Sequence, residues 1–180
     1  MKLAVIIPVY NAENTIRKAV KSIDTTHDVE IICINDGSTD RTKQVLTELQ
    51  KEVKHLIVYH QDNQGAAKSR NMGLSAMSDD IDAFMFLDAD DQFLPGKMDQ
   101  MIQYYEKNEH LDIVIGQIGR GLNGDWKVIP THEDIHREAI VSLAEAPEIL
   151  QSIGPGGKLF KAKFNTLRFD EDVVFCEEHT

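Results

Sequence analysis

Five apolar runs of strand length alternate with segments of helical periodicity, and this alternation constrains the fold of the chain more than any other feature. The runs are 3–9, 30–34, 56–59, 83–87 and 111–115. Because they are apolar throughout rather than at every second position, we expect strands that are buried on both faces. The pattern predicts an α/β domain with a mostly parallel sheet and helices on both faces.

Helices are expected between the runs, where apolar residues recur at helical spacing. The first should follow Asn11, a common N-cap type, and the second should begin at Ser38 or Thr39. The third should span 65–77, and the fourth should carry Pro95 in its first turn. These helices would supply the two covering layers.

The pattern changes after residue 115, where glycines become frequent. A strand is expected at 126–129, and Ser142 with Glu145 forms a capping box for a helix that reaches about residue 153. The segment 154–158 resembles a phosphate loop only superficially, because leucine follows its lysine. We interpret it as a turn at the rim of the site.

Length and charge limit what the chain can be. A chain of 180 residues suits a single domain, and its stop without a terminating element suggests a piece of a longer protein. The formal net charge of -11 argues against nucleic acid as a partner. No apolar stretch has the length of a membrane span and no secretory signal is present, so we expect a cytoplasmic protein. Peripheral association with the inner face of the plasma membrane would need parts outside this chain.

Three carboxylates, Asp88, Asp90 and Asp91, follow the apolar run 83–87. Side chains two positions apart on an extended segment point the same way, so Asp88 and Asp90 can face one spot. Hard oxygen ligands suit Mg²⁺ or Mn²⁺, and a site with few protein ligands leaves room for substrate phosphates. The alternative is a solvated acidic turn after a buried strand.

Polar segments follow three of the predicted strands, at 8–11, 35–38 and 88–91. Ligands of an open parallel sheet bind beyond the carboxyl ends of its strands. Each segment alone also fits a strand end, a turn or a helix cap. Their joint position favours a binding site.

A fourth segment, 63–73, places Gly65 where a helix begins and carries Lys68 and Arg70. A helix N-terminus favours negative charge, and arginine suits the recognition of phosphates. The alternative is an ordinary helix with surface charges.

Together these four segments resemble the family 2 glycosyltransferases of GT-A fold, which are inverting enzymes that use nucleotide-sugar donors. The matching residues are 8–13, 34–40, 63–73 and 87–91. The resemblance is dense through residue 96, and it implies a nucleotide-binding half at 1–96 and the start of an acceptor-binding half at 97–180. Weaker matches follow at 158–160 and 177–178.

The resemblance assigns roles to individual positions. Asp36 would hydrogen-bond the nucleobase, usually uracil, and Arg70 would reach the nucleotide. Asp90 would be the principal ligand of Mn²⁺ or Mg²⁺, and Asp88 would contact the ribose or the donor sugar beside it. The remaining positions expected to line the donor site are Pro8, Tyr10, Glu13, Asn63 and Gly65.

The catalytic base is expected from an acidic pair near the end of the chain. Family members commonly carry Glu-Asp, with the second residue as base, and here the pair is Glu177-Glu178. Glu178 would therefore accept the proton of the acceptor hydroxyl, with a side chain one methylene longer. Two exposed acids are the structural alternative.

The expected donor is a UDP-sugar, and the expected acceptor is a saccharide, polyol-phosphate or lipid-linked hydroxyl. Family breadth points to cell-wall polysaccharide, teichoic acid or glycolipid synthesis. Two alternatives remain open: a nucleotide-sugar-binding module without catalysis, and a magnesium-dependent phosphatase or nucleotidyltransferase. Aspartyl phosphatases need carboxylates after the first strand, where this chain has Pro8-Val9-Tyr10.

Overall fold

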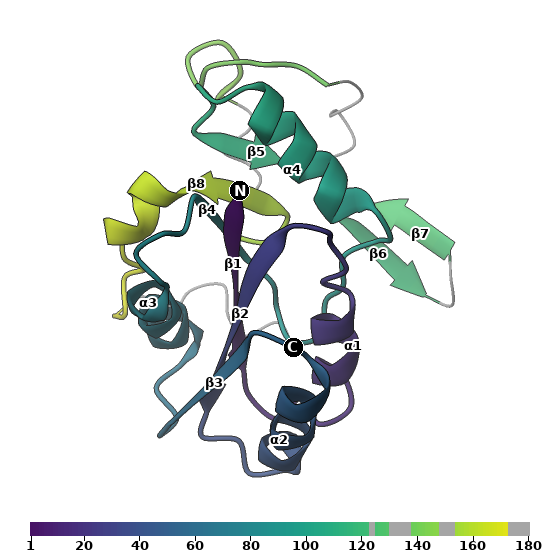
Figure 1. Cartoon of the computed structure of the whole chain (residues 1–180), viewed down its shortest axis with the longest axis vertical. Helices are drawn as coiled ribbons and strands as arrows, with labels where there is room; N and C mark the ends of the chain where they lie inside the picture. Colours follow the sequence, from purple (N-terminus) through teal and green to yellow (C-terminus); the bar gives the residue numbers. More distant parts are fainter. Residues whose placement is uncertain (123–124, 130–137, 148–153, 173–180) are drawn as a thin grey trace.

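The computed structural model describes residues 1–122, 125–129, 138–147 and 154–172. Its centre is a six-stranded sheet of order β3-β2-β1-β4-β8-β5 (Figure 1). The strands are β1 (Lys2–Val9), β2 (Asp28–Asp36), β3 (Leu56–Gln61), β4 (Ala83–Phe86), β5 (Ile113–Ile115) and β8 (Lys158–Lys161). The first four run parallel, whereas β8 lies antiparallel between β4 and β5. The predicted mostly parallel α/β sheet is confirmed.

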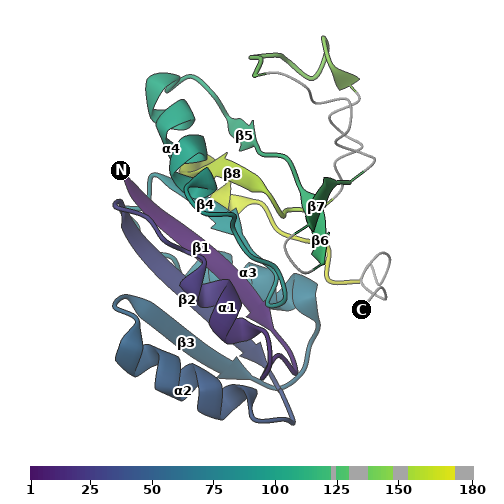
Figure 2. The same cartoon turned by 90° about the vertical axis from the view of Figure 1, so that its right-hand side faces the viewer.

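Both faces of the sheet are covered by α-helices of the described chain. These are α1 (Ile16–Lys21), α2 (Thr42–Glu52), α3 (Ala66–Ala76) and α4 (Lys97–Lys107). Leu3, Val5 and Ile7 of β1 pack with α1, α2 and α4, whereas Ala4 and Ile6 pack with α3. Figure 2 shows α1 and α2 in front of the sheet and α3 behind it. None of the described helices is long and apolar enough to cross a bilayer.

Helix α3 lies very close to the sheet at Gly73. A Cβ atom on Gly73 would come within 2.3 Å of Cγ2 of Ile6 in β1. Only a residue without a side chain permits this spacing between helix and strand. The absence of a side chain at Gly73 therefore sets how near α3 can come to β1.

The first two helices begin later than the sequence predicts. Asn11 does not cap α1: it has a φ of 48°, and its Oδ1 accepts a hydrogen bond from the backbone N of Thr39. Ser38 does not begin α2, because its Oγ accepts from the backbone N of Asn11. These residues join two loops 27 to 28 positions apart instead of starting helices. Pro95 likewise lies just before α4 rather than in its first turn.

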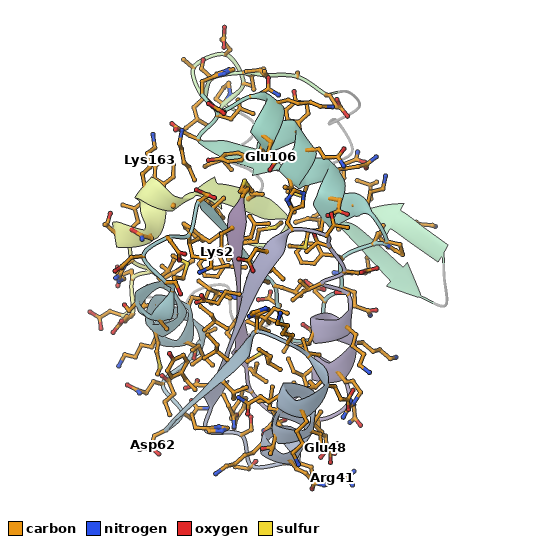
Figure 3. All side chains as sticks on the ribbon, viewed as in Figure 1. Lys2, Arg41, Glu48, Asp62, Glu106 and Lys163 are labelled. Atoms are coloured by element: carbon orange, nitrogen blue, oxygen red, sulfur yellow. The ribbon has the colours of Figure 1, made fainter. Side chains whose placement is uncertain are left out.

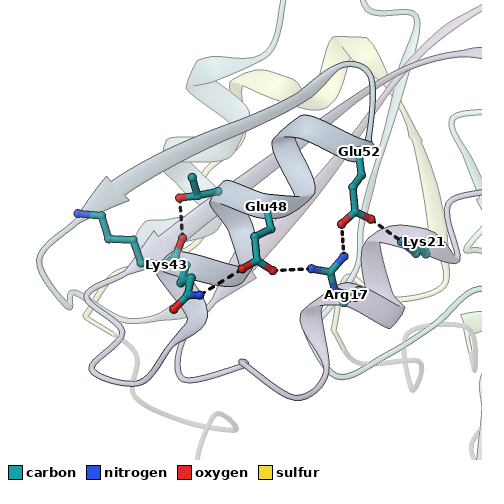
Figure 4. Close-up of polar contacts among 7 residues, drawn as sticks. Arg17, Lys21, Lys43, Glu48 and Glu52 are labelled. Carbon is teal, nitrogen blue, oxygen red and sulfur yellow. Dashed lines mark hydrogen bonds and ion pairs between the residues drawn. The ribbon is translucent and has the colours of Figure 1, made fainter.

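Charged side chains join α1 to α2 on the surface (Figure 4). Arg17 donates from Nη1 to Glu52 and from Nη2 to Glu48, at 2.6 and 3.0 Å. Lys21 lies 2.9 Å from the same Glu52 carboxylate. Because these pairs are solvent-exposed, they orient the two helices more than they stabilise them.

The later part of the chain agrees with the prediction only in part. The strand expected at 126–129 forms one residue earlier, as β7 (Asp125–Val128) paired with β6 (Gly119–Leu122). The capping box forms, since the Oε2 of Glu145 accepts from Ser142 N and Oγ at 2.8 Å. Residues 142–147 nevertheless make a turn and not an α-helix.

The absence of that helix has a physical reason. Short helices depend on packing of an apolar face, and here Val141 and Leu143 stay exposed. The rest of the predicted helix, 148–153, lies outside the described residues. The turn expected at 154–158 is present, and its Gly156 bridges Phe86 at the end of β4.

Candidate functional site

The carboxyl ends of β1, β2 and β4 meet at one edge of the sheet, as predicted. Val9 of β1 is level with Asn35 of β2, and Ile6 of β1 is level with Phe86 of β4. The segments that follow these strands therefore emerge side by side. Figure 3 shows Arg41 and Asp62 at this end of the molecule and Lys163 at the opposite end.

The loops after β1 and β2 hold each other through side chains. The backbone N of Ala12 donates to the buried Oγ1 of Thr42 at 2.8 Å. Glu13 accepts from the backbone N and the Nε of Arg41, at 2.9 and 3.2 Å, through one carboxylate oxygen. Glu13 thus lies at the predicted edge, but its carboxylate is engaged by Arg41. It fixes the shape of the loop pair.

Asp36 is buried and accepts three hydrogen bonds. Its Oδ1 accepts from Gln61 Nε2 at 2.6 Å and from Gln64 N at 2.8 Å, and its Oδ2 accepts from Gly65 N at 2.8 Å. A carboxylate offers about four acceptor positions, so about one is left for a ligand. Asp36 therefore anchors the start of α3, a role that the sequence did not reveal.

The same contacts bring the loop before α3 against the loop after β2. Gly37 has a φ of 68°, and a Cβ atom there would lie 2.6 Å from the backbone N of Asn63. Gly65 has a φ of 92° and precedes the first residue of α3. Asn63 and Gly65 are thereby placed beside the end of β2, and Gly65 lies at the start of a helix, as the sequence predicts.

Tyr10 supplies an exposed aromatic surface directly after β1. The residue is 52% exposed, whereas Pro8, two positions earlier, is partly buried in the strand. Exposed rings at a ligand-binding edge provide a face for stacking. Tyr10 and Pro8 therefore lie at the carboxyl end of β1, at the edge of the sheet where the other predicted site residues gather.

Arg70 and Asp88 form an ion pair across the site. The Nη2 of Arg70 lies 3.0 Å from Oδ1 of Asp88, and their side chains are 12% and 46% exposed. A mostly buried guanidinium thus holds an accessible carboxylate in one orientation. The sequence assigned Arg70 and Asp88 separately to a donor site, and the structure brings the two side chains into contact.

The three carboxylates of the cluster repel one another. Partial withdrawal from water, and then the charges of Asp88 and Asp90, raise the pKa of Asp91 to about 6. A bound cation would relieve this repulsion. Within the described ranges no group of three or more acidic, His or Cys side chains is arranged as a metal cage. Residues 88–91 form a turn closed by a hydrogen bond from the backbone N of Asp91 to the carbonyl O of Asp88 at 3.0 Å, so the extended segment expected for Asp88 and Asp90 is wrong. Their role as metal ligands stays a prediction from the sequence.

Two further features were missed by the sequence analysis. Asn71 on α3 binds the backbone of Phe169, and an open groove of about 490 Å³ lies between α3 and residues 168–171. Lys68, expected near the ligand, lines this groove. Gln61 could have been found from register alone, because it pairs with Asp36 across β2 and β3.

Glu178, the expected base, lies outside the described residues, as do its neighbours Glu177 and His179. The last described residue before them is Asp172. The assignment of the base therefore stays a prediction from the sequence.

Known proteins resemble this chain over nearly its whole length. The family model for glycosyl transferase family 2 matches residues 4–169. Glycosyltransferase TagX of Staphylococcus aureus (strain N315) is 38% identical over 183 residues, covering 99% of this chain and 52% of TagX. The crystal structure of S. aureus TarS 1–349 has a TM-score of 0.78 and 24% identity, covering 96% of this chain and 51% of that one. For TarS 1–349 in complex with UDP-GlcNAc the TM-score is 0.76 at 24% identity, covering 94% and 49%.

The chain spans about half the length of these relatives. The structural likeness supports the GT-A type of fold. The range matched by the family model includes every position from Pro8 to Asp90 that the sequence analysis expects in the donor site. The chain therefore belongs to glycosyl transferase family 2.

Proposed function

We propose that this chain is the donor-binding portion of a metal-dependent, inverting glycosyltransferase that uses a UDP-sugar. The observation that carries the proposal is the position of Tyr10, the Arg70–Asp88 pair and Asp90 around one edge of the sheet. An aromatic surface, a fixed cation and carboxylates for a metal are what a nucleoside diphosphate requires. Family membership and the UDP-GlcNAc bound to TarS support this donor class.

The base and ribose would lie over the loops after β1 and β2. The ring of Tyr10 would stack on the base, while Pro8 and Glu13 shape the pocket. The one acceptor position left on Asp36 would take the N–H of uracil. Asn63 and Gly65 would border the pocket from the side of α3.

Asp90 and Asp88 would hold Mn²⁺ or Mg²⁺ together with oxygens of the diphosphate. The ion, when bound, supplies positive charge that neutralises the departing nucleoside diphosphate. Arg70 keeps Asp88 oriented and adds a second positive charge beside the phosphates. This arrangement lets a chain of net charge -11 bind an anionic donor.

Transfer needs a base for the acceptor hydroxyl. As the hydroxyl oxygen bonds to the anomeric carbon from the face opposite the diphosphate, its proton passes to a carboxylate, and we assign Glu178 to that role from the family pattern. The bond from the anomeric carbon to the diphosphate oxygen breaks, UDP leaves, and the configuration inverts. We assign the acceptor to a saccharide, polyol-phosphate or lipid-linked polymer of the cell envelope, with teichoic acid as the leading case.

A binding module without transfer activity is the second candidate. It is favoured by one observation: the contacts of Asp36, Arg70 and Asp88 shape an edge that would serve donor binding with or without transfer. A phosphatase is disfavoured, because the end of β1 carries the exposed Tyr10 rather than carboxylates. Release of UDP from a UDP-sugar in the presence of Mn²⁺ separates transfer chemistry from binding alone.

The donor and metal are tested together by calorimetric titration of UDP with Mn²⁺ or with EDTA. We expect binding with Mn²⁺, a loss of at least about tenfold in affinity with EDTA, and the same loss in Asp90→Ala with Mn²⁺. Asp79→Ala removes an exposed carboxylate outside the cluster and is the matched control. Equal affinity with Mn²⁺ and EDTA would exclude the metal bridge.

The base is tested with Glu178→Gln in the longest available protein. We expect unchanged UDP affinity and a loss of transfer of about a hundredfold or more, because a general base typically contributes 10²–10⁴. Unchanged turnover would remove Glu178 from the mechanism.

A further inference from the structure

Asn71 joins α3 to a segment that lies 98 residues later in the chain. Its Nδ2 donates to the carbonyl O of Phe169 at 3.0 Å and to Oε1 of Glu171 at 2.9 Å. The backbone N of Phe169 in turn donates to Oδ1 of Asn71 at 2.8 Å. The amide of Asn71 therefore binds Phe169 through both backbone groups, as a neighbouring strand would, and it does so while buried.

The ring of Phe169 lies between the end of β4 and α3. It packs edge-to-face on Phe86, with ring centroids 5.3 Å apart. The Cζ of Arg70 lies over the same ring, 5.6 Å from its centroid. A guanidinium over a ring face is attracted to it, and the ring also restricts the rotamers that the arginine can adopt.

Arg70 is the residue that holds Asp88. The Arg70 Nη2 to Asp88 Oδ1 distance is 3.0 Å, and Asp88 comes two positions after Phe86, the last residue of β4. A continuous series of contacts thus runs from Asn71 through Phe169 and Arg70 to Asp88. The contact between Asn71 and Phe169 is structural, whereas the pair of Arg70 and Asp88 lies in the proposed donor site.

We propose that Asn71 and Phe169 are positioning residues of the donor site, which hold the guanidinium of Arg70 in the place where it orients Asp88 and meets the donor diphosphate. Neither residue need touch the donor itself. The identity of the ligand rests on the proposed function, whereas the dependence of Arg70 on Asn71 and Phe169 rests on the contacts alone. The two can therefore fail separately.

Ser75 provides a matched control on the same helix. Its Oγ accepts from Nη2 of Arg168 at 3.2 Å, so it also contacts the segment around Phe169, but one turn further from Arg70. Ser75→Ala removes this bond between the same two parts of the fold, together with a bond within α3 from Ser75 Oγ to the carbonyl O of Asn71 at 3.1 Å, but it leaves the side chain of Asn71 unchanged. A purely structural role of this region would make Ser75→Ala resemble the other variants.

The first test needs no ligand and follows the side-chain protons of Arg70 by NMR. In the unchanged protein the ring of Phe169 should shift them upfield. We expect Phe169→Leu to abolish this shift, Asn71→Asp to reduce it, and Ser75→Ala to keep it. A shift that persists in Asn71→Asp would overturn the role of Asn71, whether or not the protein binds UDP.

The second test measures UDP affinity in the presence of Mn²⁺. Phe169→Leu and Asn71→Asp should each weaken binding by about fivefold, as expected for loss of a partly desolvated cation–π contact, with Ser75→Ala unchanged. In an Arg70→Ala background Phe169→Leu should have no further effect, because it acts through Arg70. An undiminished effect of Phe169→Leu in that background would contradict the proposal. If the unchanged protein does not bind UDP, the proposed function fails, and the NMR result decides the inference alone.

Discussion

Single side chains at this edge of the sheet hold the loops of the candidate site together. The buried carboxylate of Asp36 joins the end of β2 to the start of α3 through Gln61, Gln64 and Gly65. The family resemblance predicts that Asp36 hydrogen-bonds the nucleobase. In the structure Asp36 also holds the loop before α3 against the end of β2. At this scale, a residue that is proposed to bind the donor also shapes the loops around the site.

Gly37 is required by both its backbone and its surroundings. We expect Gly37→Ala to lower the free energy of unfolding by about 2–3 kcal/mol, because a Cβ atom would meet the backbone of Asn63 at a positive φ. Gly96→Ala is the control: φ there is 71° and no atom lies within 4 Å of the added Cβ, so about 1 kcal/mol is expected. Urea unfolding of both variants measures the difference, and equal losses would show that the contact with Asn63 costs nothing.

Asp91 should destabilise the metal-free protein at neutral and higher pH. Its pKa is raised from 3.8 to about 6, so the protonated form is favoured in the folded state. The stability gained from that proton is complete below about pH 3.8 and is lost as the pH rises through about 6. At pH 8 we expect Asp91→Asn to raise the free energy of unfolding by about 1 kcal/mol, a value reduced for solvent screening.

The measurement for Asp91 is urea unfolding in EDTA across this pH range. Asp79→Asn changes an exposed carboxylate outside the cluster and serves as the control. A gain in Asp91→Asn that persists unchanged at pH 3.5 would exclude charge repulsion as its cause.

Among the secondary-structure elements, α3 connects most parts of the site. Its first residues bind Asp36 through the preceding loop, Arg70 reaches Asp88, and Asn71 holds Phe169. Gly73 lets the helix lie against β1. A displacement of α3 would therefore reach both loops and the acidic cluster.

Gly73→Ala tests the spacing between α3 and the sheet. Glycine to alanine inside a helix normally stabilises by about 1 kcal/mol, but here the added Cβ would overlap Ile6, and we expect a net loss of about 1–3 kcal/mol. Ile6→Ala should cost less in the Gly73→Ala background than alone, because it removes the clash. Urea unfolding of the four proteins measures this coupling, and additive losses would contradict it.

The sequence predicted these elements better than it predicted their ends. Continuous apolar runs identify buried strands, because burial on both faces leaves no polar positions. Asn11 and Ser38 misled the prediction of helix starts, because each uses its side chain or backbone to bind the other loop. Local patterns cannot show such partners. For the same reason the contact between Asn71 and Phe169, which are 98 positions apart, could not be predicted from the sequence. The meeting of the strand ends at one edge could be predicted, because it follows from the parallel topology of the sheet.

At the scale of the whole molecule, β8 lies between β4 and β5 and joins the two parts of the chain in one sheet. The family resemblance suggests halves at 1–96 and 97–180, yet β8 pairs with β4 and carries Phe160, whose ring stacks on Phe84 at 5.3 Å. The sheet is therefore completed by a strand from the second part. The two parts share one sheet and both of the apolar clusters that cover its faces.

We expect residues 1–96 alone not to fold into a stable monomer. Without β8, strand β4 becomes an edge, and the aromatic face of Phe84 and Phe86 loses its cover. Size-exclusion chromatography and near-UV circular dichroism should show aggregation or loss of fixed packing, while residues 1–172 serve as the comparison. A monomeric 1–96 fragment that unfolds cooperatively would contradict this.

The late arrival of β8 also bears on synthesis of the chain. On the ribosome, β1 to β4 emerge first, and the strand that closes their sheet follows only after more than seventy further residues, counted from Phe86 to Lys158. Until β8 is synthesised, the apolar edge of β4 is exposed and unpaired. Exposed strand edges of this kind bind chaperones and favour misassembly. Slowed translation across the intervening stretch should therefore lower the yield of native protein.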